Sequence, residues 1–105
     1  MKLSDLRDLL LTVSTDVFHY SALQKPDKYI VWAEDGEAGS INADDSKEDQ
    51  VIQGNIDYFT KTEFDTNFDL IQEKLNSADL SWRLNSIQYE EETGYIHYEW
   101  VFEVV

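Results

Sequence analysis

The chain has 105 residues, which is enough for one domain with a single hydrophobic core and too few for two. Its 22 acidic and 8 basic side chains give a formal charge of −14. That charge argues against binding nucleic acid through phosphates or lying on an anionic membrane, because both depend on Lys and Arg. Hydrophobic residues make up 42% of the chain and supply the apolar area that a core requires.

No apolar run approaches the length that crosses a bilayer, and the first residues turn acidic where a signal peptide would turn apolar. We therefore expect a protein made and used in a cytoplasm, with no membrane partner. The chain has no cysteine, which excludes a disulfide framework, a thiol nucleophile and a thiolate metal site.

The first third of the chain predicts one helix and two strands. Apolar residues recur at helical spacing over residues 3–13, with Ser4 as the cap. The aromatic and β-branched run 17–20 predicts a short strand, and Pro26 marks a turn. Residues 28–33 predict a second strand, which is apolar at nearly every position and is therefore expected to be covered on both faces.

Residues 34–49 predict a long, mobile, acidic loop that joins two strands. Two glycines loosen its backbone, and seven acids face a single base, Lys47. The seven acids are Glu34, Asp35, Glu37, Asp44, Asp45, Glu48 and Asp49. Carboxylates are hard donors for calcium, but the segment lacks the alternating acids, central Gly and terminal Glu of a helix-loop-helix calcium site.

The middle of the chain predicts a strand over residues 50–59, followed by a helix. Gly54 marks a bend in that strand or a close neighbour. The helix can be capped by Thr60, through a capping box with Glu63, or by Asp65. An apolar stripe along the helix is expected to lie on the sheet, and it consists of Phe64, Phe68, Ile71 and Leu75.

Residues 81–105 predict one long β-hairpin with its turn at 91–94. Side chains of the returning strand alternate between two faces. The core face holds Ile96, Tyr98, Trp100, Phe102 and Val104. The opposite face holds Tyr95, His97, Glu99, Val101 and Glu103. The outgoing strand changes phase between Leu84 and Ile87, which predicts a bulge near residues 85–86.

Residues suited to catalysis are scattered. His19 and His97 lie inside strand patterns, without carboxylates at metal-ligand or catalytic spacing nearby. A structural role, with each ring making ordinary hydrogen bonds, therefore explains them better than metal binding or catalysis. The acids at 90–92 fit a solvated turn better than an acid–base pair. Neither Asp35-Gly36 nor Thr93-Gly94 leads into a helix, as a glycine-rich phosphate-binding loop would. We expect no enzymatic activity, no metal and no cofactor.

Three stretches, 29–36 (YIVWAEDG), 52–61 (IQGNIDYFTK) and 82–104, together resemble tail terminator (tail completion) proteins of long-tailed phages and prophages of Gram-positive bacteria. The patterns above give the order α-β-β-β-α-β-β over a single domain, residues 1–105. That order is compatible with the α+β fold that the resemblance implies, in which two helices pack on one mixed or antiparallel sheet of about five strands.

The resemblance also implies a virion protein at the head–tail junction. Six copies would form a ring that ends the tail tube and offers a docking surface to the head connector. The expected partners are further copies of the chain, the major tail tube protein and a head-completion or connector protein, while DNA passes through without specific binding. We expect the acidic loop to project from a rim or into the channel, where carboxylates keep DNA off the wall. The outward residues 95–103 of the last strand are the expected interface.

Two other classes of protein fit the same sequence. One is a different ring-forming connector or adaptor of the head–tail junction. The other is an acidic inhibitor that mimics DNA, since a charge of −14 can imitate phosphates. A mimic needs carboxylates at rigid spacing, whereas the densest acids here lie in a segment that contains glycine.

Overall fold

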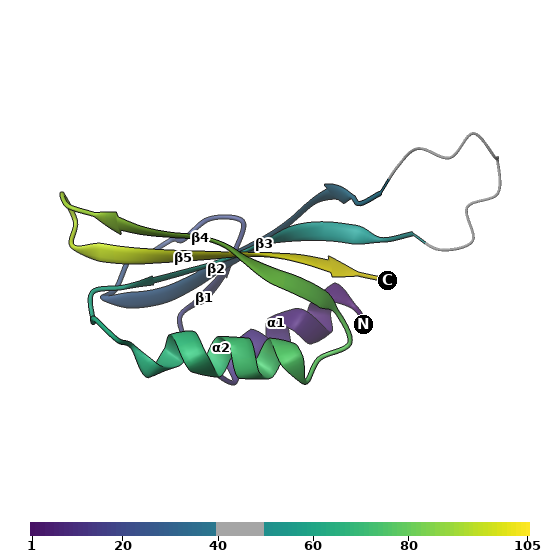
Figure 1. The fold of residues 1–105 in the computed structure, drawn as a ribbon, viewed down its shortest axis with the longest axis horizontal. Helices are drawn as coiled ribbons and strands as arrows, with labels where there is room; N and C mark the ends of the chain where they lie inside the picture. The colour runs from purple at the N-terminus through teal and green to yellow at the C-terminus, as the bar shows by residue number, and fades with distance from the viewer. Residues whose placement is uncertain (40–49) are drawn as a thin grey trace.

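The computed structural model describes residues 1–39 and 50–105, and residues 40–49 lie outside the described part. Its elements, in chain order, are α1 (Leu3–Leu11), β1 (Val17–His19), β2 (Lys28–Glu37), β3 (Ile52–Thr60), α2 (Thr66–Asn76), β4 (Ser81–Glu90) and β5 (Tyr95–Val104). The predicted element order and the α+β class are confirmed. Figure 1 shows both helices against one side of a single five-stranded sheet.

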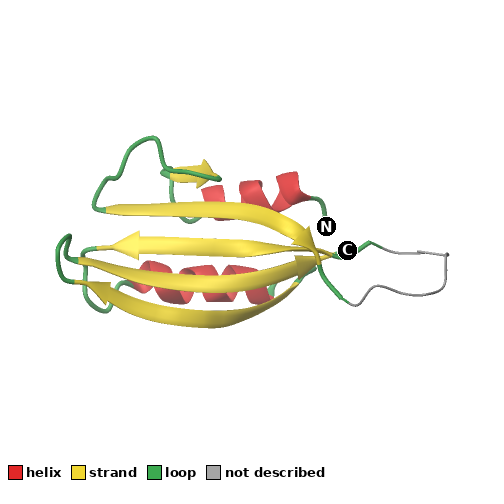
Figure 2. Cartoon of the chain, turned by 90° about the horizontal axis from the view of Figure 1, so that it is seen from above, coloured by secondary structure: helices red, strands yellow, loops and turns green. Residues whose placement is uncertain are grey.

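The strands lie in the order β1-β2-β3-β5-β4. β1 runs parallel to β2 and the other neighbours are antiparallel, so the sheet is mixed. β1 and β4 are therefore its two outermost strands, as the view onto the sheet shows (Figure 2). No described helix covers the opposite side of the sheet, and we call that side the open face.

The core lies between the helices and the sheet, and it confirms the predicted alternation of the last strand. Its fully buried or nearly buried members are Leu6, Leu10, Ile30, Trp32, Ile56, Tyr58, Ile71, Leu75, Tyr98, Trp100, Phe102 and Val104. Trp100 is the largest side chain with no exposed surface, and its indole nitrogen donates a 3.2 Å hydrogen bond to Gln72 of α2. This bond satisfies the only polar atom of a ring that is otherwise in apolar contact.

The predicted bulge in the hairpin is confirmed. The register of β4 against β5 shifts between Leu84 and Ser86. The extra residue returns Ile87 and Tyr89 to the helix side of the sheet, where they stand opposite Tyr98 and Ile96. Both side chains are more than half exposed, so the bulge presents apolar surface that the described helices leave uncovered.

Gly54 has the close neighbours that the sequence suggested. A Cβ atom at this position would lie 2.1 Å from the carbonyl oxygen of Ala33 and 2.7 Å from the ring of Phe102. The adjoining part of β2 contains a second register shift, between Glu34 and Gly36. The irregular strand therefore approaches β3 more closely than any side chain at Gly54 would permit.

The structure corrects the predicted start of the first helix and confirms one of the two caps predicted for the second, Asp65. α1 is capped at Lys2 rather than Ser4, and the carboxylate of Asp5 accepts a 2.9 Å hydrogen bond from the Lys2 amide. α2 is capped by Asp65, whose Oδ1 accepts from the amide of Asn67 at 2.9 Å, so the capping box at Thr60 is wrong. Asp65 was the stronger of the two candidates, because it lies nearest to the apolar periodicity that marks α2. A capping side chain must reach the first free backbone amides of its helix.

The predicted stripe of α2 is wrong at its first member. Phe68, Ile71 and Leu75 pack on the sheet, but Phe64 precedes the helix and is 89% exposed. Its backbone has φ = 56°, in the left-handed region, so it cannot belong to a right-handed helix.

The acidic segment also begins differently from the prediction. Glu34, Asp35 and Glu37 belong to β2, which continues to Glu37, and β3 begins at Ile52 rather than Gln50. Backbone pairing with β3 extends the strand through residues with low β propensity, because each pair satisfies amides and carbonyls that a loop would leave to water. Asp44, Asp45, Glu48 and Asp49 lie outside the described residues.

Candidate functional site

The open face carries the residues that the sequence assigned to an interface. Tyr95, His97, Glu99, Val101 and Glu103 all project from β5 on the side away from the helices, since the alternate residues of β5 form the core. His97 stands opposite Phe59 of β3 and Gln88 of β4. The five residues therefore share one side of the sheet, although they occupy two different environments.

The first environment is aromatic. Phe59 stacks on Tyr29 with ring centroids 4.6 Å apart and on His97 at 4.2 Å. Tyr95 meets Tyr29 edge-on at 5.6 Å, and its hydroxyl donates to the carbonyl oxygens of Lys25 (3.0 Å) and Pro26 (2.7 Å). Burial is the main cause that raises the pKa of Tyr29 to about 12.

These contacts make Tyr95 part of the monomer's own packing, because it ties the β1–β2 connection to the hairpin. They also bear out the prediction that β2 is covered on both faces. Ile30 is buried under the helices, while Tyr29 is buried on the open face.

His97 is held by an acidic neighbour. Its Nε2 atom lies 2.7 Å from Oδ1 of Asp57, and both side chains are about one-fifth exposed. This hydrogen bond raises the pKa of His97, against the effect of burial, and the negative charges of Asp57, Glu90 and Glu99 act in the same direction. His97 therefore keeps its positive charge to a higher pH than an unperturbed histidine does.

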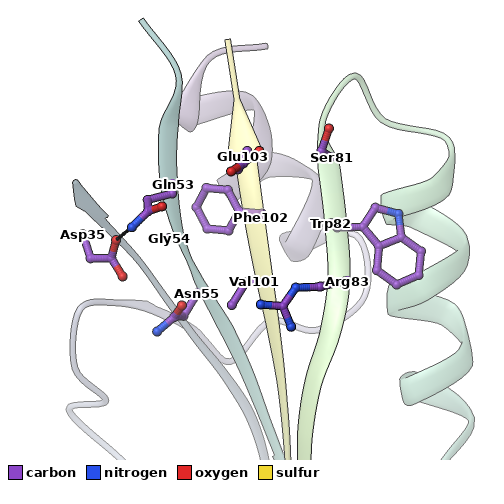
Figure 3. Close-up of a pocket in the computed structure, with 10 residues that line it drawn as sticks. All are labelled: Asp35, Gln53, Gly54, Asn55, Ser81, Trp82, Arg83, Val101, Phe102 and Glu103. Atoms are coloured by element: carbon purple, nitrogen blue, oxygen red, sulfur yellow. Dashed lines mark hydrogen bonds between the residues drawn. The ribbon is translucent and has the colours of Figure 1, made fainter. Parts of the chain in front are cut away.

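The second environment is a shallow polar trough of about 460 Å³ near the end of β5 (Figure 3). Its lining residues are Asp35, Gln53, Gly54, Asn55, Ser81, Trp82, Arg83, Val101, Phe102 and Glu103. Gln53 donates a 3.2 Å hydrogen bond to Asp35 on one side. On the other side Arg83 donates to Asn85 at 3.0 Å, and Asn85 donates to Glu99 at 2.6 Å.

The trough therefore combines amides, carboxylates and one guanidinium around an aliphatic side chain, Val101. Such a surface can hydrogen-bond to the polar groups of another protein and bury an apolar contact at its centre. The sequence missed the contributions of Asn55 and Arg83. Gln53 and Asn55 are two positions apart in the predicted strand 50–59 and therefore lie on one side of it, so a signal existed, but the pairing of β3 and β4 with β5 did not follow from it.

The acids at the start of the predicted acidic loop do not form one site. Glu34 contacts His19 at 3.0 Å and accepts a hydrogen bond from the hydroxyl of Tyr20. Asp35 lines the trough, and Glu37 accepts from Gln50 at 3.1 Å. Within residues 1–39 and 50–105, no three His, Asp or Glu side chains come together as metal ligands.

Both histidine rings have partners. His19, besides its contact with Glu34, stacks on Trp32 with centroids 4.0 Å apart, and His97 is bound to Asp57. Neither described helix is long and apolar enough to cross a membrane.

No protein-family model matches the chain, and no curated protein matches it at a significant level.

Proposed function

We propose that this protein is a structural subunit of a phage virion, a tail terminator that forms a ring on the end of the tail tube and offers a docking surface to the head connector. The observation that carries the proposal is the open face, bounded by the outermost strand β4. A sheet face that no described helix covers, beside a ten-residue strand without a described neighbour on its outer side, is a surface on which another protein can pack or continue the sheet.

The residues of the open face suit contacts between proteins. Its polar trough offers hydrogen-bond donors from Asn55 and Arg83 and acceptors from Asp35 and Glu103, with Val101 between them. Interfaces that form after folding combine an apolar centre with a polar surround in this way, because the surface must stay soluble before its partner arrives. The aromatic half of the face is closed by the chain's own loop, which leaves the trough as the accessible half.

The charge of the chain supports the same role. DNA must move through a terminator ring, and a wall that bound phosphates would hold it back. A formal charge of −14 gives a wall that repels the duplex. The described ends of β2 and β3 extend beyond the helices (Figure 1) and carry Asp35 and Glu37, so they bring negative charge to one end of the subunit.

The experiment is to delete the gene for this chain from its phage or prophage and examine the lysate by electron microscopy. We expect filled heads without attached tails, together with tails of uncontrolled length, and we expect the chain to be present in intact particles. Filled heads beside free tails of normal length would favour a connector or adaptor instead. Infectious particles with normal tails would contradict every virion role.

A charge-matched pair of variants tests the trough itself. Arg83→Glu changes the charge of the trough, and Lys2→Glu makes the same charge change at the exposed start of α1. We expect both variants to fold, because both side chains are exposed. Only Arg83→Glu should lower the yield of joined particles, and equal yields from the two variants would argue against the trough as an interface.

A further inference from the structure

Arg83 is the only basic side chain among the residues that line the trough. It stands in β4 opposite Val101 of β5, and Val101 in turn stands opposite Asn55 of β3. Figure 3 shows the guanidinium reaching across β5 toward Val101, with Asn55 on the far side. The three residues therefore form one row across the open face, with a hydrogen-bond donor at each end and an aliphatic side chain between them.

The two donors of this row have few partners within the subunit. In the described part of the chain Arg83 forms no ion pair, and its one hydrogen bond, from Nη1 to Asn85, leaves its other N–H groups without a protein partner. The side-chain amide of Asn55 likewise has no hydrogen bond there. The isolation of Arg83 is unexpected, because Glu99 and Glu103 are its diagonal neighbours on β5 and a long side chain can reach that far.

The bulge in β4 explains why Arg83 does not pair with Glu99. Ser86 stands opposite Glu99 and Asn85 is the extra residue, so two residues of β4 oppose one residue of β5. The side-chain amide of Asn85 donates to Glu99 at 2.6 Å, and its oxygen accepts from Arg83 at 3.0 Å. Asn85 therefore separates the two charged groups, and it holds the guanidinium in place without neutralising it.

We propose that Arg83 binds the carboxylate of an acidic side chain on the protein that docks in the trough, and that Asn85 is the positioning residue that keeps the guanidinium available. This inference deepens the proposed function and rests on it, because it names the group that the trough recognises. Guanidinium and carboxylate match in shape and charge, and they form charge-assisted hydrogen bonds. Asn55 supplies a further donor on the other side of Val101.

The charges around the row favour a single carboxylate carried by a protein. Asp35 and Glu103 also line the trough, and Glu99 is bound to Asn85 beside it, so the surroundings repel a nucleic acid or a phosphate group. One charge-assisted contact in a shallow trough holds a free small molecule weakly, whereas a protein adds contact area around it. Bases on the same protein can meet Glu103, two residues farther along β5.

Selection for second-site changes tests the acidic partner. Arg83→Glu is introduced into the phage or prophage, and infectious revertants that retain this change are sequenced. We expect compensating changes in another virion protein, in which an Asp or Glu becomes Lys or Arg, because the reversed pair restores the attraction. Compensating changes in this chain alone, such as Glu99→Lys, would show that Arg83 serves the subunit itself and would overturn the inference.

Variants of Asn85 give a second measurement, which needs no revertants. Asn85→Ala removes the spacer, so Arg83 should pair with Glu99 and the yield of joined particles should fall about tenfold, with no loss in melting temperature. Adding Glu99→Gln removes the competing carboxylate and should restore the yield to within about twofold of wild type. A merely structural role for Asn85 predicts no such rescue, so a double variant as defective as Asn85→Ala would overturn the positioning role.

Arg83→Lys and Arg7→Lys form a matched pair. Both keep the positive charge and lose the forked guanidinium, but Arg7 pairs with its neighbour Asp8 on α1 at 3.0 Å, away from the trough. Only Arg83→Lys should lower the yield of joined particles, by about tenfold. Wild-type joining by Arg83→Lys and Asn85→Ala, where deletion of the gene blocks joining, would overturn the inference and leave the terminator proposal standing. Normal joining after the deletion would overturn both.

Discussion

The hydroxyl of Tyr58 in β3 donates a 2.7 Å hydrogen bond to Oδ2 of Asp65, the residue that caps α2. The same oxygen accepts from the hydroxyl of Thr60 at 2.6 Å and lies 3.3 Å from the ammonium group of Lys28. Asp65 is only 4% exposed. One carboxylate therefore satisfies a free amide of the helix and fixes that helix to two strands.

Replacing Asp65 by Ala should destabilise the protein strongly. The change removes the helix cap and leaves the buried hydroxyls of Tyr58 and Thr60 without their acceptor. We expect a loss of about 3 kcal/mol in the free energy of unfolding, measured by urea denaturation. Thr60→Val, which removes one donor and keeps its shape, should cost about 1 kcal/mol. Equal losses for both variants would show that Asp65 acts only through Thr60.

The ionised form of Asp65 should contribute stability that acid removes. Burial by itself would raise its pKa, but hydrogen bonds from Thr60, Tyr58 and the Asn67 amide, with Lys28 nearby, hold the pKa below the usual 3.8. Between the two values the unfolded chain binds more protons, so stability falls as pH drops through this range. We expect wild type to exceed Asp65→Asn in stability above about pH 4 and to lose that advantage at lower pH. A constant difference from pH 7 to pH 2 would contradict this.

The pair formed by His97 and Asp57 should depend on pH in the opposite sense. Because the folded pKa of His97 is raised above 6.5, the folded chain holds the proton more tightly than the unfolded chain. The stabilisation is therefore complete below pH 6.5 and is lost as pH rises through the folded pKa. NMR titration should give a His97 pKa above its usual value, and Asp57→Asn should lower it. An unchanged pKa in that variant would rule out Asp57 as the main cause.

Gly54→Ala should be among the most damaging small substitutions in the sheet. The added methyl group would lie 2.1 Å from a backbone oxygen of β2, and backbone cannot move aside as a flexible side chain can. We expect a loss of about 3 kcal/mol in the free energy of unfolding, measured by chemical denaturation. Gly94→Ala is the contrast, because nothing lies within 4 Å of a Cβ there and only the positive φ opposes it, so its loss should be about 1 kcal/mol. Similar losses at both glycines would contradict the close approach at Gly54.

Phe64 and Phe68 should respond to truncation in opposite ways, although both were predicted to lie on the sheet. Phe64 is exposed with φ = 56°, so Phe64→Gly should leave the melting temperature unchanged or raise it. The ring centroid of Phe68 lies 4.5 Å from that of Tyr98 and 5.7 Å from that of Trp100. Phe68→Ala should therefore lower the free energy of unfolding by about 3 kcal/mol. Thermal unfolding of the two variants checks the contrast. A lower melting temperature for Phe64→Gly would mean that its ring packs within the monomer.

Hydrophobic periodicity by itself determined the elements of this protein and their order. The alternation from Ile96 to Val104 identified the core face of β5, because successive side chains of a strand must point to opposite sides. The change of phase after Leu84 located the bulge for the same reason. These signals are local, since each depends only on residues a few positions apart along the chain.

Tertiary structure decided what depends on residues distant in sequence. Pairing with β3 drew Glu34 to Glu37 into β2, although the composition of that segment favours a loop. The sheet order brought Asn55 and Arg83 to either side of Val101 and so formed the trough, while Lys25 and Pro26 closed over Tyr95 and removed it from the accessible face. Local propensity differs by tenths of a kilocalorie per residue, roughly, and backbone pairing and burial across the sheet outweigh it.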